Sequence, residues 1–275
     1  MNTTSEKLDA RAAVAFAREL YHSTGKQEYP ALLFSALKKI APFDIYTVTV
    51  FSANARPFFL FGNLAEFVSS SVIKKFLSGT YMLDAVYTAC CERVPEGLYR
   101  LTELAPDNYF SSDFYNSADF HPCVSDDAGS LAEEIVYMAK PTDNLYLVLS
   151  LMRRKGYTAF DEIEFDNLKL LQDVVVETSI EHWKQSVTAS VPAASSSQST
   201  LEKAVATFAK DKLSPREQTI VSLLLRGHST LSVAHNLDIA EGTAKVHRRN
   251  IYDKLGITSQ AEMFLMFCEH VITIR

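Results

Sequence analysis

Apolar and polar positions recur with helical spacing at the start of the chain and alternate with strand spacing further on. Helical patterns cover about 5–23, 30–41, 64–78 and 80–92. Strand patterns are found in DIYTVTVF (44–51), RPFFLFG (56–62), SLAEEIVYMA (130–139) and NLYLVLSLM (144–152). Short linked strands flanked by helices predict an antiparallel sheet with helical cover, and hence an α+β fold of the sensor type.

Two connections and one long helix in this region have their own signals. Pro95, Gly97, Pro106 and Pro122 predict a long irregular stretch between the second helix pair and the later strands. Those later strands are joined through Pro141, Thr142 and Asp143. The segment from 158 to 183 predicts one long helix over about 160–185, opened by a capping arrangement from Thr158 to Asp161.

The last 75 residues predict four short helices with clear ends. Ser214, Pro215 and Glu217 form a capping-box signature, and Gly227 ends the first helix. A short helix over about 229–236 and a third over about 241–255 follow, and Gly256 stops the third. The fourth helix begins with a second capping box, Ser259 with Glu262. Its segment AEMFLMFC is apolar nearly all round, which predicts that one face covers the domain core and the other meets a partner.

The balance of basic and acidic side chains changes at the point where the hydrophobic pattern also changes. Residues 1–200 carry 17 basic and 25 acidic side chains, whereas residues 201–275 carry 10 and 8. Between them, SVTASVPAASSSQST is poor in large apolar residues and is typical of a flexible linker. We therefore predict an N-terminal sensor domain over 1–185, a linker over 186–200 and a separate C-terminal domain over 201–275.

Several classes of function are disfavoured. No apolar run approaches the roughly 18 residues of a membrane span, and the polar N-terminus lacks a signal-peptide core, which predicts a cytoplasmic protein. Cys90, Cys91, Cys123 and Cys268 have no metal-ligand or disulfide spacing. No nucleophile, base and acid set and no phosphate-binding glycine loop is found, so neither an enzyme nor a cofactor is expected.

The third helix of the C-terminal region carries an unusual concentration of positive charge. On a helical wheel, Ala244, His247, Ile251 and Leu255 share one face, which would dock the helix on its neighbours. Lys245, Arg248 and Arg249 then lie outward. We count Asp253 against Arg249 as the only carboxylate at four-residue spacing from these cations, which is too few for an ordinary solvated helix face.

These features together resemble one family closely. The stretches LSPREQ, LLLRGHST, VAHNLDIAEGTAKVHRRNIYDKLGI and SQAE, within residues 213–269, are similar to the LuxR-type helix–turn–helix domain of bacterial transcription regulators. The resemblance implies base contacts from Lys245, Val246 and Arg249. It implies phosphate or backbone contacts from Thr243 and Arg248, and pairing of two copies through the fourth helix.

The sequence departs from the family pattern at three positions. Leu231 stands where the family has Lys, Asp238 where it has Gly, and Ala240 where it has Ser at the start of the third helix. A phosphate contact and an N-cap are thereby lost, which predicts weaker non-specific DNA affinity. The alternative is a protein-interaction module with a degenerate helix–turn–helix.

The N-terminal domain is expected to bind a small-molecule effector. A receiver domain has a different element order. An acyl-homoserine-lactone pocket would need tryptophans in the sheet region, but the only tryptophan is Trp183, near the linker. The segment from Gly79 to Tyr115 is similar to a GAF-like or PAS-like domain found on other LuxR-type regulators.

Candidate effector contacts are few. Tyr81, Asp84 and Tyr87 share a helical face, and Asp126 and Asp127 lie in the irregular stretch. An acidic, tyrosine-rich pocket would favour a cation such as an amine. The alternative is that the tyrosines belong to the core and that Asp126 and Asp127 form a solvated turn. The sequence names neither the effector nor the operator, nor does it distinguish activation from repression.

Overall fold

The computed structural model describes residues 6–52, 55–117, 121, 131–186, 204 and 207–273. The chain divides into two compact units. The first comprises 1–67, 93–103 and 127–195, and the second comprises 68–92, 104–126 and 196–275. The linker predicted at 186–200 lies outside the described residues from 187 onward, so the domain boundaries remain a prediction.

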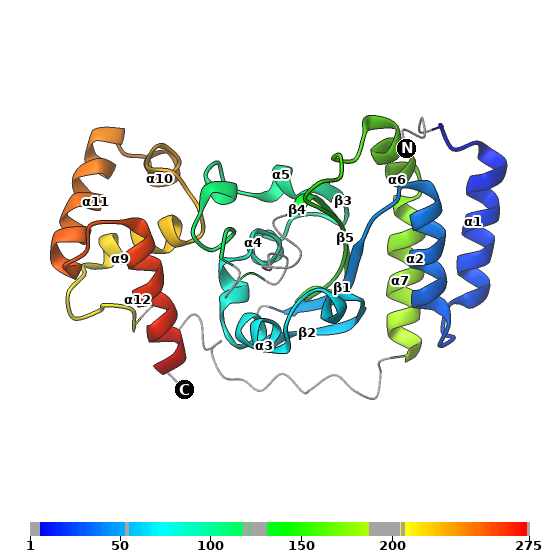
Figure 1. The fold of residues 1–275 in the computed structure, drawn as a ribbon, viewed down its shortest axis with the longest axis horizontal. Coiled ribbons are helices and arrows are strands. Elements are labelled where there is room, and N and C mark those ends of the chain that lie inside the picture. The colour runs from blue at the N-terminus through cyan, green and yellow to red at the C-terminus, as the bar shows by residue number, and fades with distance from the viewer. Residues whose placement is uncertain are drawn as a thin grey trace. The chain divides into compact units, whose positions relative to one another are not determined.

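A five-stranded antiparallel sheet forms the centre of the first unit. Its order is β2-β1-β5-β4-β3 (Figure 1). The strands are β1 (Ile45–Ser52), β2 (Ala55–Gly62), β3 (Gly97–Arg100), β4 (Leu131–Thr142) and β5 (Leu145–Arg154). The α+β fold predicted from the sequence is confirmed.

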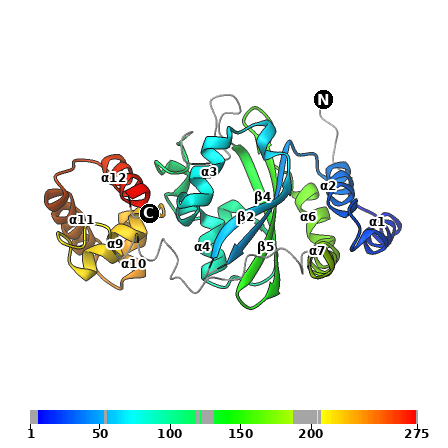
Figure 2. The same cartoon turned by 90° about the horizontal axis from the view of Figure 1, so that it is seen from below.

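Helices cover one face of this sheet. They are α1 (Ala10–Ser23), α2 (Tyr29–Ile40), α6 (Glu162–Leu170) and α7 (Gln172–Ser186), and Figures 1 and 2 show all four on the same side. Alternate strand residues, such as Val48, Leu149 and Tyr137, pack with Leu33 and Val175 in one apolar core. This alternation follows from the two-residue period of a strand, which sends every second side chain to the same face.

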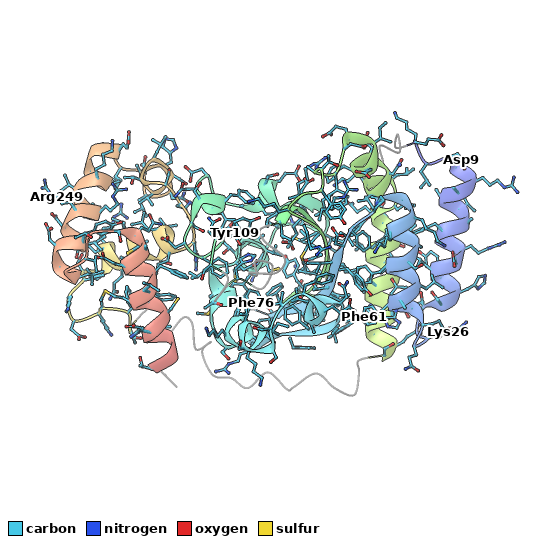
Figure 3. All side chains as sticks on the ribbon, viewed as in Figure 1. Asp9, Lys26, Phe61, Phe76, Tyr109 and Arg249 are labelled. Carbon is cyan, nitrogen blue, oxygen red and sulfur yellow. The ribbon has the colours of Figure 1, made fainter. Side chains whose placement is uncertain are left out.

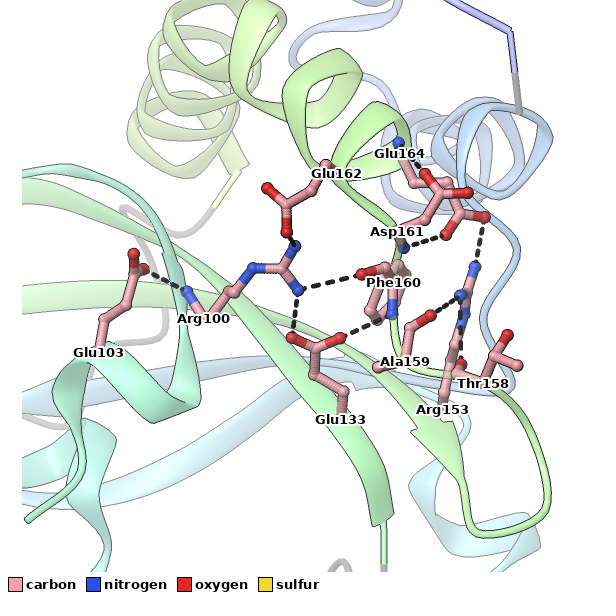
Figure 4. A network of polar contacts seen from close by, with 10 residues as sticks. All are labelled: Arg100, Glu103, Glu133, Arg153, Thr158, Ala159, Phe160, Asp161, Glu162 and Glu164. Atoms are coloured by element: carbon pink, nitrogen blue, oxygen red, sulfur yellow. Dashed lines mark hydrogen bonds and ion pairs between the residues drawn. The ribbon is translucent and has the colours of Figure 1, made fainter. Parts of the chain in front are cut away.

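A polar network ties one end of strands β3, β4 and β5 to the start of α6 (Figure 4). Arg153 of β5 donates to Glu164 at 2.6 Å and to the carbonyl of Pro42 at 2.7 Å, and both charged side chains are buried. Arg100 of β3 pairs with Glu133 of β4 and, at 3.1 Å, with Glu162. Each buried charge thus has an opposite partner, which offsets the cost of removing it from water.

Three local predictions in this unit were wrong. The stretch expected to be irregular contains β3, whose Leu98 lies opposite Tyr137 of β4. The N-cap of α6 is Asp161, not Thr158, and it forms a capping box with Glu164. The long helix is broken at Leu171, between α6 and α7, where the Leu168 carbonyl accepts both the Leu171 N–H at 3.2 Å and the Tyr137 hydroxyl at 2.9 Å.

Other elements begin or end at residues that differ from the prediction. The first helix begins at Ala10 after the N-cap Asp9, not near residue 5. The strands β4 and β5 were expected to be joined through 141–143. Thr142 still pairs with Leu145, so the turn of the hairpin consists of residues 143 and 144 alone. The helical patterns at 64–78 and 80–92 each divide into a 3-10 turn and an α-helix.

The second unit is helical. Its N-terminal segments contain α3 (Ser70–Ser78), the 3-10 turn η2 (Thr80–Leu83), α4 (Ala85–Cys91) and η3 (Tyr109–Ser111). Its C-terminal part contains α9 (Pro215–Leu225), α10 (Thr230–Asn236), α11 (Glu241–Leu255) and α12 (Gln260–Thr273). Two short pieces complete the described elements of the chain, η1 (Leu64–Glu66) and α5 (Leu101–Leu104). The four predicted C-terminal helices are confirmed.

Within the described residues, no helix is long and apolar enough to cross a membrane.

Candidate nucleic-acid interface

The first helix of the C-terminal domain is fixed at its start by a carboxylate with two roles. Glu217 and Ser214 form the predicted capping box, so that each side chain accepts the other's backbone N–H. Glu217 also accepts from Lys254 Nζ of α11, at 2.7 and 2.8 Å. Burial alone would raise the pKa of Glu217, but the hydrogen bonds from Lys254 and Ser214 lower it. The same carboxylate therefore caps α9 and docks the far end of α11.

The turn between α10 and α11 adopts a conformation that most residues avoid. Asp238 has φ of +51°, in the left-handed region where the family's glycine costs nothing. Aspartate is among the few other residues that visit this region readily. Ala240 is the N-cap of α11 and makes no side-chain cap, as predicted. The departure at 238 thus keeps the turn, whereas the departure at 240 removes a hydrogen bond.

α11 buries the predicted face and exposes the predicted basic face. Ala244, Ile251 and Leu255 are buried, whereas His247 is only half-buried. The helix ends at Gly256, which has φ of +71°. Because the buried residues fix its rotation, the opposite side chains are held outward.

Four of the five predicted DNA contacts lie on that exposed surface. Thr243, Lys245, Val246 and Arg249 are exposed, and 47% of the Val246 surface is accessible to solvent. Arg249 lies on the side of α11 that faces away from the other helices of the domain (Figure 3). An exposed valine between cations contributes nothing to the domain core, but it suits contact with the methyl group of a thymine.

One part of the charge count was wrong. Glu241 lies four residues before Lys245, and their side chains pair at 2.7 Å. Both groups are exposed, so the pair contributes little to stability. Arg249 forms no ion pair with Asp253 among the described residues. The basic surface is therefore partly compensated at Lys245 but not at Arg249.

Arg248 is positioned differently from the other four. Its Nη1 donates to Thr230 Oγ1 of α10 at 2.8 Å, and its side chain is half-buried. This contact joins the first turn of α10 to the middle of α11. It holds the guanidinium beside the start of α10, and the prediction of a phosphate contact from Arg248 stays untested.

Sequence reasoning missed the contacts that join helices of this domain. The helical pattern gives Lys254 no role and predicts only a capping role for Glu217. Opposite charges on Glu217 of α9 and Lys254 of α11 could have indicated an ion pair. Only the packing of α9 against α11 shows that the two residues meet.

α12 buries more of its apolar surface than the pattern suggested. Met263, Phe264, Phe267 and Cys268 are all buried. The Phe267 and Phe208 rings lie 5.4 Å apart, and 53% of the Leu265 surface is exposed. Its capping box is also altered, since Glu262 accepts from the Thr258 N–H at 2.7 Å rather than from Ser259. The dimer through α12 remains a prediction.

The candidate effector residues Tyr81, Asp84 and Tyr87 lie close together in the second unit. The two tyrosine rings are 4.9 Å apart and perpendicular, and both are buried. Asp84 is the N-cap of α4, and its Oδ1 accepts from the N–H groups of Val86 at 2.8 Å and Tyr87 at 3.2 Å. Burial raises the pKa of Asp84 to about 6.

Asp84 thus caps α4, and both tyrosines are buried, while the assignment of these residues to an effector site stays a prediction. Asp126 and Asp127 lie outside the described residues. So does Cys123. Cys90 and Cys268 are buried free thiols, whereas Cys91 is exposed, and the described part of the chain holds no cluster of potential metal ligands.

A short helix, a tight turn and a basic second helix with an exposed N-terminal half define a helix–turn–helix domain, which is a DNA-binding class. Residues 211–267 match the family model of bacterial regulatory proteins, luxR family. The C-terminal domain is thus of the LuxR type.

Two proteins similar in sequence to this chain are named as transcriptional regulators. A protein of Aeromonas salmonicida named as an HTH-type transcriptional regulator in the exeN 3′ region is 28% identical over 198 residues, which cover 69% of this chain and 95% of the relative. The transcriptional regulatory protein MctR of Rhizobium johnstonii is 40% identical over 65 residues, covering 24% of this chain and 30% of MctR.

A solved structure resembles the N-terminal part of the chain. The LBD (ligand-binding domain) of VqsR from Pseudomonas aeruginosa superposes with a TM-score of 0.52 and 20% identity, covering 63% of this chain and 98% of that domain. The likeness shows that the two share a fold.

Proposed function

We propose that two copies of this protein bind a two-fold symmetric DNA site through α11 and that a small molecule bound by the N-terminal domain controls this binding. The observation that carries the proposal is the outward face of α11. Lys245, Val246 and Arg249 are exposed on one side, and the buried face fixes their direction. A helix held in this way can present its N-terminal half to base edges in the major groove.

Each side chain has a role that its chemistry suits. Arg249, which has no ion-pair partner among the described residues, can donate two hydrogen bonds to a guanine. Lys245 can exchange its exposed pair with Glu241 for a base, because such a surface pair is weak. Thr243, in the first turn, and Arg248, held by Thr230, would contact phosphates.

The proposed effector region contains Tyr81, Asp84 and Tyr87. Of the two Asp84 carboxylate oxygens, only Oδ1 accepts hydrogen bonds from the described residues, so Oδ2 is available to a donor on the effector. A carboxylate beside two tyrosines favours an amine-bearing effector, bound in a GAF-like or PAS-like sensor domain. We expect no acyl-homoserine lactone, because the only tryptophan, Trp183, belongs to α7. The shared fold with the VqsR domain supports a ligand-binding role.

Selection from random duplex DNA tests the DNA-binding part. Purified full-length protein is expected to enrich a two-fold symmetric motif, and a Lys245→Ala/Arg249→Ala double variant is expected to lose it. Lys210→Ala/Lys212→Ala is the matched control, since it removes two cations outside α11. Enrichment of the same motif by the double variant would show that α11 does not read the sequence.

A salt titration separates this proposal from a protein-interaction module. Leu231, which is 48% exposed where the family has a lysine, favours the module, because it removes one phosphate contact. DNA binding through several phosphates gives a log–log slope of about −0.9 per contact. A flat response of DNA binding to salt would favour the module instead.

A further inference from the structure

A cavity of about 140 Å³ lies between the helices and the sheet of the first unit. Leu33 of α2, Leu149 of β5 and Trp183 of α7 are among its walls, and Leu60 and Phe61 of β2 also line it. All of its lining residues belong to the first unit, and none is a candidate effector residue. Figure 3 labels Phe61 on the strand that faces these helices.

The walls favour an uncharged occupant. Leu33 and Leu149 are fully buried, whereas 38% of the Leu60 surface is exposed, so Leu60 marks the side that reaches solvent. The lining contains no aspartate, glutamate, lysine or arginine. A charged molecule would therefore lose its hydration without gaining an ionic partner, which is costly.

One end of the cavity is polar, and its hydrogen bonds have a defined direction. Thr178 donates its hydroxyl proton to the Val174 carbonyl at 2.6 Å, so it accepts from the Tyr29 hydroxyl at 2.8 Å. Tyr29 Oη then accepts from Ser179 Oγ at 3.0 Å. Ser179, which lines the cavity, has then spent its only proton, so its oxygen can act there only as an acceptor.

The third polar side chain of the lining, the imidazole of His182, is neutral. The Gly25 N–H donates to His182 Nδ1 at 3.1 Å, which makes that nitrogen an acceptor. Burial lowers the pKa of His182, in agreement with an uncharged ring. The imidazole stacks on Tyr29 with ring centroids 4.4 Å apart, so it extends the flat aromatic wall.

The volume sets the size of the occupant. A dry apolar cavity of about 150 Å³ in another protein accepts benzene. We infer that this cavity is a second ligand site, distinct from the proposed effector region, and that it binds a neutral single-ring aromatic molecule with one hydroxyl or N–H group. The ring packs between Leu33, Leu149 and Trp183, and its donor bonds Ser179 Oγ.

Two probes differing by one hydroxyl test the assignment on the full-length protein. 4-Fluorophenol and fluorobenzene are titrated and followed by ¹⁹F NMR, together with the emission of Trp183, the only tryptophan of the chain. Both probes are expected to bind saturably and to change the emission. 4-Fluorophenol is expected to bind about fivefold more tightly, the worth of one neutral hydrogen bond.

Variants locate the site. Ser179→Ala removes the acceptor but not the cavity, so it is expected to abolish the preference for 4-fluorophenol and leave fluorobenzene unchanged. Leu149→Phe fills the cavity and is expected to weaken both probes. Leu170→Phe is the control, because 62% of that leucine's surface is exposed on α6, outside the cavity.

Circular dichroism establishes that each variant is folded, and Ser179→Ala keeps the test valid if Leu149→Phe does not fold. The inference is overturned if neither probe moves the Trp183 emission up to its solubility limit. It is also overturned if Ser179→Ala leaves the preference intact.

Discussion

At the scale of single residues, two glycines of the DNA-binding domain have opposite surroundings. Gly227 has φ of +93°, and a Cβ added there would lie 2.8 Å from the Tyr109 Cα. A Cβ added at Gly242, in α11, would meet nothing within 4 Å. We expect Gly227→Ala to lower the free energy of unfolding by at least about 1 kcal/mol and Gly242→Ala to raise it by up to about 1 kcal/mol, in urea denaturation. Equal effects of the two changes would contradict this assignment.

Arg249 and Arg248 make different contacts, so their replacement should have different effects on DNA binding. Arg249→Ala should cost about 1–3 kcal/mol on the best operator and relax one base position, because its guanidinium is exposed and unpaired among the described residues. Arg248→Ala should weaken operator and random DNA alike. Binding measured on both DNAs distinguishes the roles, and the Lys210→Ala variant serves as control. A uniform loss for both arginines would exclude base reading by Arg249.

Asp84 should make stability depend on pH in a defined direction. Its pKa is about 6 in the folded chain, against 3.8 for the free side chain, so the folded state retains its proton between these values. Stability should therefore fall as the pH rises from 3.8 to 6 and then level off. Asp84→Asn keeps an oxygen for the cap but cannot ionise. The difference in unfolding free energy between the two proteins should change by at most about 3 kcal/mol over this window.

Denaturation of both proteins from pH 3.5 to 7 gives this difference. The other titratable groups are the same in the two proteins, so their contributions cancel in the difference. Parallel pH profiles would show that burial does not perturb Asp84.

At the scale of elements, α11 begins with an incomplete cap. The φ and ψ of Ala240, −64° and 143°, already suit an N-cap, but methyl carbon cannot accept the free N–H groups of the first turn. Ala240→Ser should stabilise the domain by about 1 kcal/mol. Ser214→Ala, which removes an existing cap from α9, should cost a similar amount. Thermal unfolding of the two variants measures both changes in stability. If Ala240→Ser destabilised the domain, the turn before α11 could not accommodate a side-chain cap.

Elements with local signals could be predicted, and elements made by distant contacts could not. Ser214, Gly227 and Gly256 act within one turn of their own helix, so the sequence sufficed to define α9 and α11. β3 has only four residues and exists because it pairs with β4, far along the chain. The break at Leu171 likewise has no glycine or proline beside it that would predict it from the sequence.

The same distinction applies to the DNA-binding surface. Helical period and the family pattern predicted which side of α11 is exposed. The Lys254–Glu217 and Arg248–Thr230 contacts depend on how the helices pack, and a single sequence does not contain that geometry.

At the scale of the whole molecule, the proposed dimer places a geometric demand on DNA. Two recognition helices related by two-fold symmetry reach the same side of the duplex when half-site centres are about one turn, roughly 10 base pairs, apart. Inserting five base pairs between the half-sites turns the second one to the opposite side of the duplex. We expect binding to the altered operator to fall to that of an isolated half-site.

Gel-shift titrations with the native, the five-base-pair and a scrambled second half-site provide the measurement. The scrambled operator is the control, because it retains one half-site and the same length of DNA. If two copies bind through a shared interface, the five-base-pair insertion should bind no better than this control. Retained affinity for the inserted operator would mean that each copy binds independently, and the exposed face of α12 would then need another partner.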